Sequence, residues 1–320
     1  MTQPAPRSNE YRASLLAIWS ALSVVYLVWG STYLAIRFAV ETTPPFLSAA
    51  TRFIVSGGCL FLWRRAAGDA KPTLAQWRSA AIVGSLLLVG GNGGVVWAAQ
   101  FIPSSLSALL VATVPLWMVA LDFVRPGGSQ PGRRALAGIL VGFIGVVLLV
   151  RAASTAGSFN PFGVTAVLLA CVSWALGSLY GRTASLPASP LLATGMEMLI
   201  GGIAQFFIAL ALDEWSGFDL AAVSQRSALA LIYLTVIGSC AFVAYAWLLR
   251  VAPTPLVATY AYVNPLVAVL LGYSLAGEPI TLRTLLAAGL IIGSVVLVSS
   301  KNSRPADAAV KSFAVTAKSP

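Results

Sequence analysis

The same pattern of five apolar segments occurs twice along this chain, and the duplication limits its fold more than any other feature. Residues 174–203, shifted back by 145 positions, align without a gap on residues 29–58, and seven of the thirty positions are identical. Two further segments repeat in the same order at offsets of 150 and 149, so chance identity is a poor explanation. The first alignment pairs Trp29 with Trp174, Arg37 with Arg182, Pro45 with Pro190, Gly57 with Gly202, and Arg52 with Glu197.

The composition is that of a membrane protein. Hydrophobic residues make up 58% of the chain and charged residues only 9%, with a mean hydropathy of +0.86. Soluble domains carry about 25% charged residues. Ten apolar segments approach the roughly 20 residues that an α-helix needs to cross a bilayer. They are 14–36, 44–63, 79–99, 104–123, 134–150, 161–181, 190–211, 228–249, 255–276 and 283–299.

These segments predict an all-α integral membrane protein with ten transmembrane helices, arranged as two inverted five-helix repeats around a central cavity. Because each repeat has an odd number of spans, the two copies must have opposite orientations, as in many secondary transporters. The longest connection, about residues 212–227, leaves no room for a soluble catalytic or nucleotide-binding domain. The expected parts are an N-terminal tail (1–13), a first repeat (14–152), a linker (153–160), a second repeat (161–300) and a C-terminal tail (301–320).

The net charge of +10 indicates an orientation in the membrane and not nucleic-acid binding. If the N-terminus is cytoplasmic, fifteen Lys and Arg residues fall in cytoplasmic loops and tails, and only four fall on the other side. Such an excess marks the cytoplasmic face. We therefore expect both termini in the cytoplasm, the lipid bilayer as a partner, and no nucleic acid. The four residues on the other side are Arg37, Arg151, Arg226 and Arg283.

Arg52 and Glu197 are the two charged residues deep inside apolar segments. A charge at that depth costs at least a few kcal/mol, so retention of both by chance is improbable. Three interpretations stay open. The first is a structural role, as one ion pair or as separate pairs to helix ends and backbone carbonyls. The second is contact of Arg52 with a substrate carboxylate and of Glu197 with an ammonium group. The third is proton coupling through Glu197. The chain contains no histidine, which excludes a histidine relay.

Polar and aromatic side chains in mid-segment predict the wall of a substrate cavity. Tyr33, Ser178 and Asn264 each share a helix face with an aromatic residue one turn earlier. Asn92 stands among four glycines, which either loosen the helix or let it pack closely. An aromatic wall with few charges suits small amphipathic solutes, and helix packing is the alternative role for each residue. The predicted cavity residues are Trp29, Tyr33, Asn92, Trp174, Ser178, Tyr260 and Asn264.

Prolines and glycines at matching positions indicate kinks and close helix contacts. Pro115 and Pro265 each remove a backbone hydrogen bond within a segment, and they either act as hinges in transport or only shape the helices. Glycines four residues apart let helix backbones approach closely in lipid. Such packing faces, within a monomer or between the copies of a homodimer, are expected at Gly138, Gly142, Gly289 and Gly293.

Four short motifs also carry a resemblance to a known family. They are Val-Trp-Gly-Ser-Thr-Tyr at 28–33, Ala-Thr-Arg-Phe at 50–53, Gly-Met-Glu-Met at 195–198 and Tyr-Ala-Tyr-Val-Asn-Pro-Leu at 260–266. Their order and spacing resemble the EamA-type drug/metabolite transporter superfamily, from about residue 15 to 299. The resemblance implies a ten-helix inner-membrane transporter, often an exporter of amino acids, including aromatic ones. It also implies that Arg52 and Glu197 occupy the family's positions for an intramembrane arginine and acid.

The sequence therefore predicts a secondary transporter that exports small metabolites, with amino acids as the leading cargo, across the bacterial inner membrane by alternating access. The alternative is a proton-coupled multidrug or quaternary-cation exporter. An intramembrane enzyme is disfavoured, because no mid-segment cysteine or serine stands beside a base and no paired carboxylates could hold a metal. We expect no cofactor and no metal. The expected partners are a small-molecule substrate and lipid.

Overall fold

The structure is a bundle of α-helices, without β-strands in the part of the chain that it describes. This computed structural model describes residues 15–125, 130–155, 160–252, 257 and 259–299, so the predicted tails lie outside it. The first half contains α1 (Leu15–Ala39), α2 (Pro45–Ala66), α3 (Leu74–Gly84), the π-helix η1 (Ser85–Gly93), α4 (Gly94–Ala98), α5 (Ser104–Val111), α6 (Val114–Val124) and α7 (Arg133–Thr155). The second contains α8 (Pro161–Gly181), α9 (Pro190–Ala211), the short 3-10 helix η2 (Leu220–Ala222), α10 (Gln225–Val251), α12 (Tyr260–Ala276) and α13 (Leu282–Ser299).

Eight of the described helical segments are long and apolar enough to cross a membrane. One of them joins α3, η1 and α4, and another joins α5 and α6. Two shorter apolar helices follow, at Tyr260–Ala276 and Leu282–Val298. The all-α class is confirmed for the described residues, and the count of ten spans stays a prediction.

Local sequence determines where several helices begin. Proline occupies the first turn of α2, α8 and α9, where its missing N–H costs no hydrogen bond. Asn160 caps α8 by accepting hydrogen bonds from the nitrogens of Phe162 and Gly163, at 3.0 and 3.1 Å. Thr73 and Gln76 form a capping box at the start of α3. These caps define the connections between neighbouring antiparallel helices.

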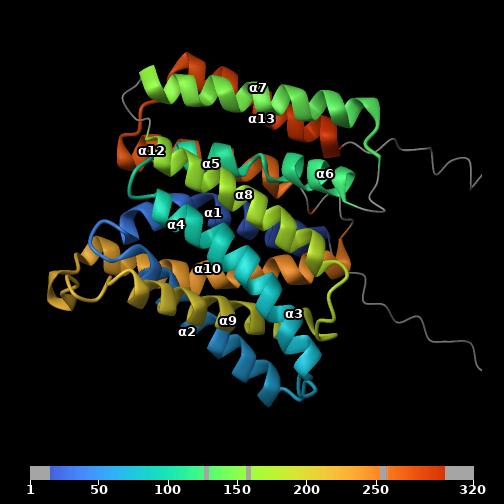
Figure 1. Cartoon of the computed structure of the whole chain (residues 1–320), viewed down its shortest axis with the longest axis vertical. Coiled ribbons are helices and arrows are strands. Elements are labelled where there is room, and N and C mark those ends of the chain that lie inside the picture. Colours follow the sequence, from blue (N-terminus) through green and yellow to red (C-terminus); the bar gives the residue numbers. More distant parts are fainter. Residues whose placement is uncertain (1–14, 126–129, 156–159, 253–256, 258, 300–320) are drawn as a thin grey trace, which may run out of the picture.

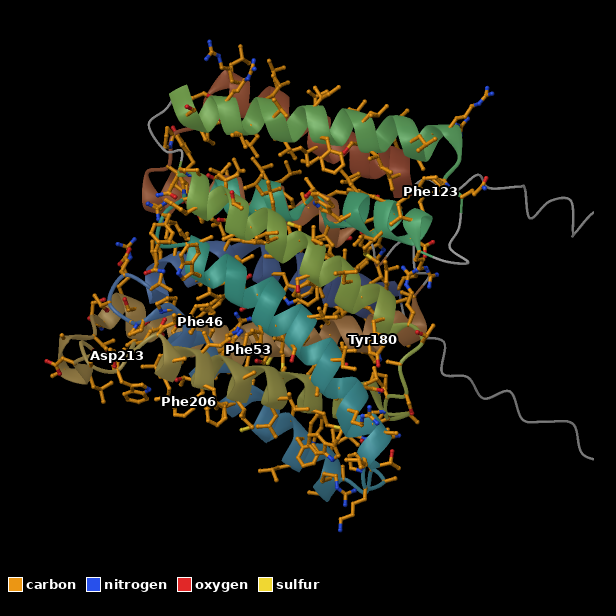
Figure 2. All side chains as sticks on the ribbon, viewed as in Figure 1. Phe46, Phe53, Phe123, Tyr180, Phe206 and Asp213 are labelled. Atoms are coloured by element: carbon orange, nitrogen blue, oxygen red, sulfur yellow. The ribbon has the colours of Figure 1, made fainter. Side chains whose placement is uncertain are left out.

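Successive helices run back and forth between two faces of the bundle (Figure 1). α1 begins and α13 ends at the same face, on the right of the view, which we call the terminal face. The connections after α1, α4, α9 and α12 lie at the opposite face, which we call the distal face. Phe123 and Tyr180, near the ends of α6 and α8, lie toward the terminal face, and Asp213 lies at the distal face (Figure 2).

The helices pack in pairs that join the two halves. α2 packs against α9, α7 against α13, and α5 against α12. α1 lies against α10 and α12, while α8 lies against η1 and α6. Suppose that each segment of the first half is replaced by the equivalent segment of the second half, and the reverse. Each of these contacts then becomes itself or another contact of the same set.

Glycines bring the backbones of α2 and α9 together. A Cβ atom on Gly57 would lie 2.5 Å from the backbone nitrogen of Leu199, and a Cβ on Gly202 would lie 2.7 Å from the backbone nitrogen of Ile54. Neither position has room for a side chain. Gly57 and Gly202 are 145 residues apart, as are Ile54 and Leu199, so the two contacts are equivalent across the repeat.

Carboxylates hold both ends of this helix pair. Just past the end of α9, Glu214 accepts hydrogen bonds from two backbone nitrogens in the first turn of α2, at 3.2 and 2.8 Å. At the equivalent position just past α2, Asp69 bonds to Ser189, the N-cap of α9. Hydrogen bonds from Arg64, and then that from Ser189, hold the pKa of Asp69 at about 2, below its ordinary value. Negative charge is favourable at helix N-termini.

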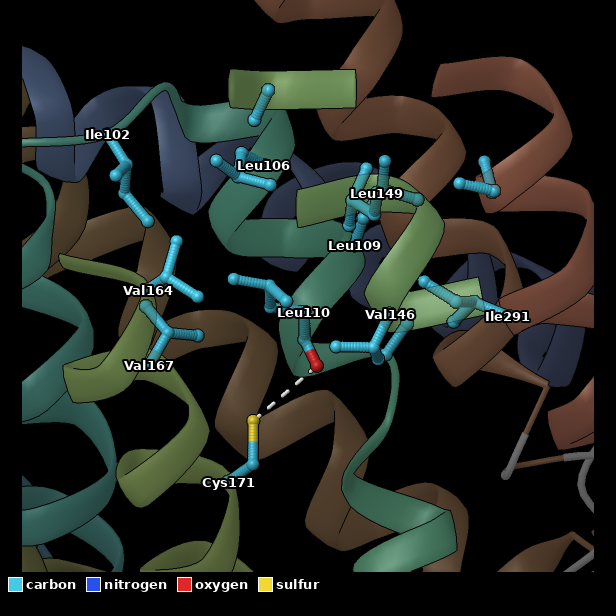
Figure 3. Close-up of a cluster of buried hydrophobic side chains, with 14 of the residues drawn as sticks. Ile102, Leu106, Leu109, Leu110, Val146, Leu149, Val164, Val167, Cys171 and Ile291 are labelled. Atoms are coloured by element: carbon cyan, nitrogen blue, oxygen red, sulfur yellow. Dashed lines mark hydrogen bonds between the residues drawn. The ribbon is translucent and has the colours of Figure 1, made fainter. Parts of the chain in front are cut away.

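One apolar core crosses the boundary between the halves (Figure 3). Leu109 and Leu110 of α5 are fully buried at its centre. Side chains on the outer faces of α7 and α13, such as Leu140 and Leu285, are instead exposed, as expected for helices that face lipid. The labelled core residues are Ile102, Leu106, Leu109, Leu110, Val146, Leu149, Val164, Val167, Cys171 and Ile291.

Candidate functional site

Arg52 is buried between helices of both halves. Its residue is only 4% exposed, and its guanidinium lies over Gly238 of α10, where an added Cβ would be 3.4 Å from Nη2. Cζ lies 4.6 Å from the centre of the Phe53 ring. Nε and Nη1 have no hydrogen-bond partner among the described residues. Arg52 therefore has unused donors and a charge that no described residue pairs.

A small cavity adjoins Arg52. Its volume is about 10 Å³, which is room for about one water molecule. Pockets for small molecules measure roughly 300–1,000 Å³, so the cavity in this conformation is too small to hold a small-molecule substrate. Side chains from α1, α2, α4 and α10 fill the space between the halves. Besides Arg52, the lining residues are Ile36, Ala39, Ser48, Ala49, Val96, Leu231 and Leu234.

Glu197 lies apart from Arg52, on α9 where that helix passes the start of η1. A Cβ on Gly84 would be 2.6 Å from the Glu197 backbone oxygen, so α3 and α9 touch at this point. Glu197 is half-buried and takes part in none of the four ion pairs within the described ranges. Direct ion pairing between Arg52 and Glu197 therefore does not hold these two charges in place.

Trp29 and Tyr260 meet in one aromatic cluster. The Trp29 ring lies 5.2 Å from that of Tyr260, 5.1 Å from Phe242 and 5.0 Å from Tyr245, measured between ring centroids. The indole Nε1 of Trp29 is buried and has no partner among the described residues. Tyr33, one turn further along α1, is half-buried. The cluster joins α1 of the first half to α10 and α12 of the second.

Asn264 connects α12 to α1 at the edge of this cluster. Its residue is 6% exposed. With its amide nitrogen turned toward them, it donates to the carbonyl oxygens of Tyr260, at 3.1 Å, and Tyr26, at 3.3 Å. The Tyr26 hydroxyl also hydrogen-bonds to Thr259. Asn264 thus has a packing role in this conformation.

Trp174, Ser178 and Asn92 form a second group around η1. A Cβ on Gly91 would be 2.8 Å from Cε3 of Trp174, so the indole packs directly on the π-helix. Ser178 donates to the Trp174 carbonyl within α8, at 2.8 Å. The Asn92 Oδ1 atom is buried, with no partner in the described part of the chain. The predicted cavity residues therefore fall into two groups, one for each of the equivalent tryptophans Trp29 and Trp174.

The glycine-rich segment around Asn92 is a π-helix, and side chains of the second half bind its carbonyl groups. Ser173 donates to Leu86 O at 2.7 Å, and the Gln205 amide nitrogen donates to Leu88 O at 2.5 Å. Gln205 is fully buried, and its Oε1 atom has no partner among the described residues. π-Helices often occur at functional sites. Gln205 was not among the predicted cavity residues, although an uncharged amide in an apolar segment could have indicated it.

The two prolines differ in their surroundings. The helix is interrupted between α5 and α6, just before Pro115. There the Leu110 carbonyl accepts hydrogen bonds from Thr113 Oγ1, at 2.6 Å, and from Cys171 Sγ, at 3.5 Å (Figure 3). Pro265 lies inside the continuous helix α12. A hinge role for either residue stays a prediction.

The glycine faces also differ. A Cβ on Gly138 would lie 2.7 Å from Val298, and one on Gly142 would lie 2.7 Å from Ser294 Oγ, so both glycines pack against α13. Gly289 and Gly293 have no described atom within 4 Å of an added Cβ. Their contribution to packing within one molecule is therefore absent in the described structure, and packing between two copies stays a prediction.

The EamA-like transporter family model matches the chain twice, at residues 15–151 and 161–300. The chain belongs to this family. It is 39% identical to "Uncharacterized inner membrane transporter YedA" of Escherichia coli strain K12 over 89% of the chain and 91% of that protein. It is 25% identical to a chloroplastic WAT1-related protein of Arabidopsis thaliana, over 88% of the chain and 69% of that protein. It is 24% identical to "Uncharacterized transporter YvbV" of Bacillus subtilis, over 90% of the chain and 93% of that protein.

A solved structure supports the fold. It has a TM-score of 0.61 and 22% identity, and the match covers 91% of this chain and all of the other. Family membership and these relatives identify a membrane transporter, and they point away from an enzyme.

Proposed function

We propose that this EamA-family protein is a secondary transporter that exports small metabolites, with amino acids as the leading cargo, by alternating access. The observation that carries the proposal is the buried guanidinium of Arg52, which no residue in the described part of the chain pairs. Removing an isolated charge from water is costly, and a carboxylate is the natural partner for a guanidinium. A buried guanidinium without a partner among the described residues is therefore suited to a ligand that supplies the carboxylate.

Buried acceptors support a zwitterionic cargo. The free Oε1 of Gln205 and the free Oδ1 of Asn92 can each accept a hydrogen bond from an ammonium group. The aromatic cluster around Trp29 supplies an apolar surface for the cargo side chain. An amino acid combines these three features.

The packing of the helices supports two inverted repeats at 14–152 and 161–300. The contacts are preserved when the halves are exchanged, and the glycine contacts of α2 and α9 are reciprocal. The two matches to one family model agree with this division. In the conformation described, the space beside Arg52 admits about one water, so cargo entry requires the halves to move apart.

We place the protein in the bacterial inner membrane with its terminal face in the cytoplasm. The name of the E. coli relative supports the location. The connections at the terminal face carry most of the basic residues outside the tails, which supports the orientation. Under this orientation the distal face is periplasmic.

A proton-coupled cation exporter is the second candidate. Glu197 favours it, because this intramembrane carboxyl group has no ion-pair partner among the described residues. A cation bound near Glu197 would compete with protons for the same group. This mechanism needs Glu197 but does not need the donors of Arg52.

Transport into proteoliposomes tests the proposal. Vesicles with wild-type protein should take up labelled threonine, methionine or phenylalanine above empty vesicles. Arg52→Gln should lower that flux at least about tenfold, since a charged hydrogen-bonded pair is worth more than about 1.4 kcal/mol. The control is Arg151→Gln, because Arg151 is an exposed arginine at the end of α7.

Absence of flux for all three amino acids would contradict the amino-acid proposal. The same vesicles should then be tested with a labelled quaternary ammonium ion. Uptake of that ion by Arg52→Gln, together with its loss in Glu197→Gln, would favour the second candidate.

A further inference from the structure

Glu278 reaches from the second half into the first at the distal face. It lies in the turn between α12 and α13, and its residue is 3% exposed. Oε1 accepts hydrogen bonds from the backbone nitrogen and the hydroxyl of Ser104, at 2.7 and 2.8 Å, and Oε2 accepts one from the nitrogen of Ser105, at 2.9 Å. Arg37, at the end of α1, forms an ion pair with the same carboxylate. We call these four residues the distal latch.

The backbone around Glu278 is shaped to aim this carboxylate. Gly277 has a φ of +63°, a left-handed conformation that ends α12 and favours glycine. The Glu278 nitrogen then donates to the Gly272 carbonyl, at 3.0 Å. A Cβ on Gly272 would lie 2.5 Å from Glu278 Oε2. Two glycines therefore turn the chain and leave space for the side chain.

The surroundings of Glu278 favour its charged form. Burial raises the pKa of Glu278, but the hydrogen bonds from Ser105 and Ser104 outweigh burial and hold the pKa below its ordinary value. The carboxylate also faces the N-terminus of α5, where a negative charge is favourable. The lowered pKa favours the carboxylate form of Glu278, which is the form that pairs with Arg37.

Other contacts close the distal face at the same place. Ser227 Oγ of α10 donates to the Phe38 carbonyl of α1 at 2.8 Å, and the nitrogen of Ser224 donates to Thr42 Oγ1 at 3.0 Å. Across the repeat, the end of α8 is equivalent to the end of α1, and the start of α3 is equivalent to the start of α10; both lie at the terminal face. Among the described residues no hydrogen bond joins those two ends, and Arg182, the equivalent of Arg37, is in no ion pair.

We propose that the distal latch keeps the distal face of the transporter closed, and that its contacts break each time the protein opens there. The proposal rests on the alternating-access function proposed above. Ile36 lines the cavity beside Arg52, and the next residue, Arg37, belongs to the latch. Release of the end of α1 would therefore move a wall of the cavity and expose Arg52 from the distal side.

Thiol labelling of the full-length protein tests this role. The three native cysteines, Cys59, Cys171 and Cys240, are first replaced by alanine. Ser48→Cys then places one thiol in the cavity wall beside Arg52. A membrane-impermeant maleimide, applied to whole cells, reports on access from the periplasm. Glu278→Gln should raise the labelling rate at least about fivefold, and Arg37→Gln should raise it less, because it leaves the cap of α5 intact.

Glu41→Gln is the matched control. Glu41 lies at the same face and pairs with Arg226 at 3.6 Å, but both side chains are exposed, so the labelling rate should not change. Labelling of a folded Glu278→Gln protein at the wild-type rate would overturn the proposal. If that variant does not fold, an unchanged rate in Arg37→Gln would overturn it, and a raised rate would support it.

The labelling assay needs no cargo, so the two proposals fail in different ways. Fast labelling of Glu278→Gln without amino-acid flux in any vesicle would support the latch and contradict the proposal that amino acids are the cargo. Normal amino-acid flux together with slow labelling of every variant would support the proposed function and contradict the role of the latch.

Discussion

If Arg52 binds the cargo carboxylate as proposed, its buried charge should lower the stability of the empty protein, and this cost can be measured. Two of its nitrogens are buried without a partner among the residues that the structure describes, so an apolar side chain of similar length should fit better. Arg52→Met should raise the free energy of unfolding by about 1–3 kcal/mol and abolish amino-acid uptake. Thermal unfolding in detergent and flux in proteoliposomes measure the two effects.

Arg37→Met is the control for this prediction. It removes the partner of the buried Glu278, so it should lower thermal stability. If Arg52→Met lowers the free energy of unfolding by more than about 1 kcal/mol, Arg52 has a structural partner. That result would contradict its proposed role in binding the cargo.

Single residues were predictable where one property sufficed. Arg52 and Glu197 could be identified because a charge deep in an apolar segment needs no knowledge of its neighbours. Glu278 could not, because its backbone partners lie 174 and 173 residues earlier in the chain. Gln205 also escaped, because its bond to a π-helical carbonyl depends on a helix type that apolar periodicity does not distinguish.

At the scale of helices, the crossing of α2 and α9 yields a paired prediction. Gly57→Ala should lower the free energy of unfolding by about 1–3 kcal/mol, because the new methyl group would meet the α9 backbone at 2.5 Å. Gly202→Ala should cost a similar amount at the equivalent contact. The adjacent Gly58→Ala should cost nothing, because no described atom lies within 4 Å of its Cβ. Equal effects of Gly57→Ala and Gly58→Ala on thermal unfolding would contradict this packing.

The lengths of the apolar segments predicted the positions of the helices closely, but they did not predict the interruptions within helices. The predicted segments at 161–181 and 190–211 coincide with α8 and α9. The π-helix at Ser85–Gly93 and the break between α5 and α6 were not predicted as such. Glycines and Pro115 indicated weakened helices there, but the form of each defect depends on side chains from α8 and α9 that bind the freed carbonyls.

For the whole molecule, the near-symmetry of the two halves is the feature that bears most on the proposed mechanism. The helix contacts and the carboxylate caps of Asp69 and Glu214 recur in both halves, which suits two states of similar energy. The distal latch adds contacts that join the two halves at the distal face. The repeat was visible in sequence, but the size of the cavity was not, because it depends on how far the halves approach.

If two oppositely oriented halves enclose the Arg52 site, equivalent loops must lie on opposite sides of the membrane. Lys71 and Ser216 are exposed residues 145 positions apart, in the connections after α2 and α9. Single cysteines at these positions, in the cysteine-free protein, should react from opposite sides of the membrane. An impermeant maleimide should label Ser216→Cys in intact cells, and Lys71→Cys only after permeabilisation. Labelling of both cysteines from the same side would contradict the inverted arrangement and the transport mechanism built on it.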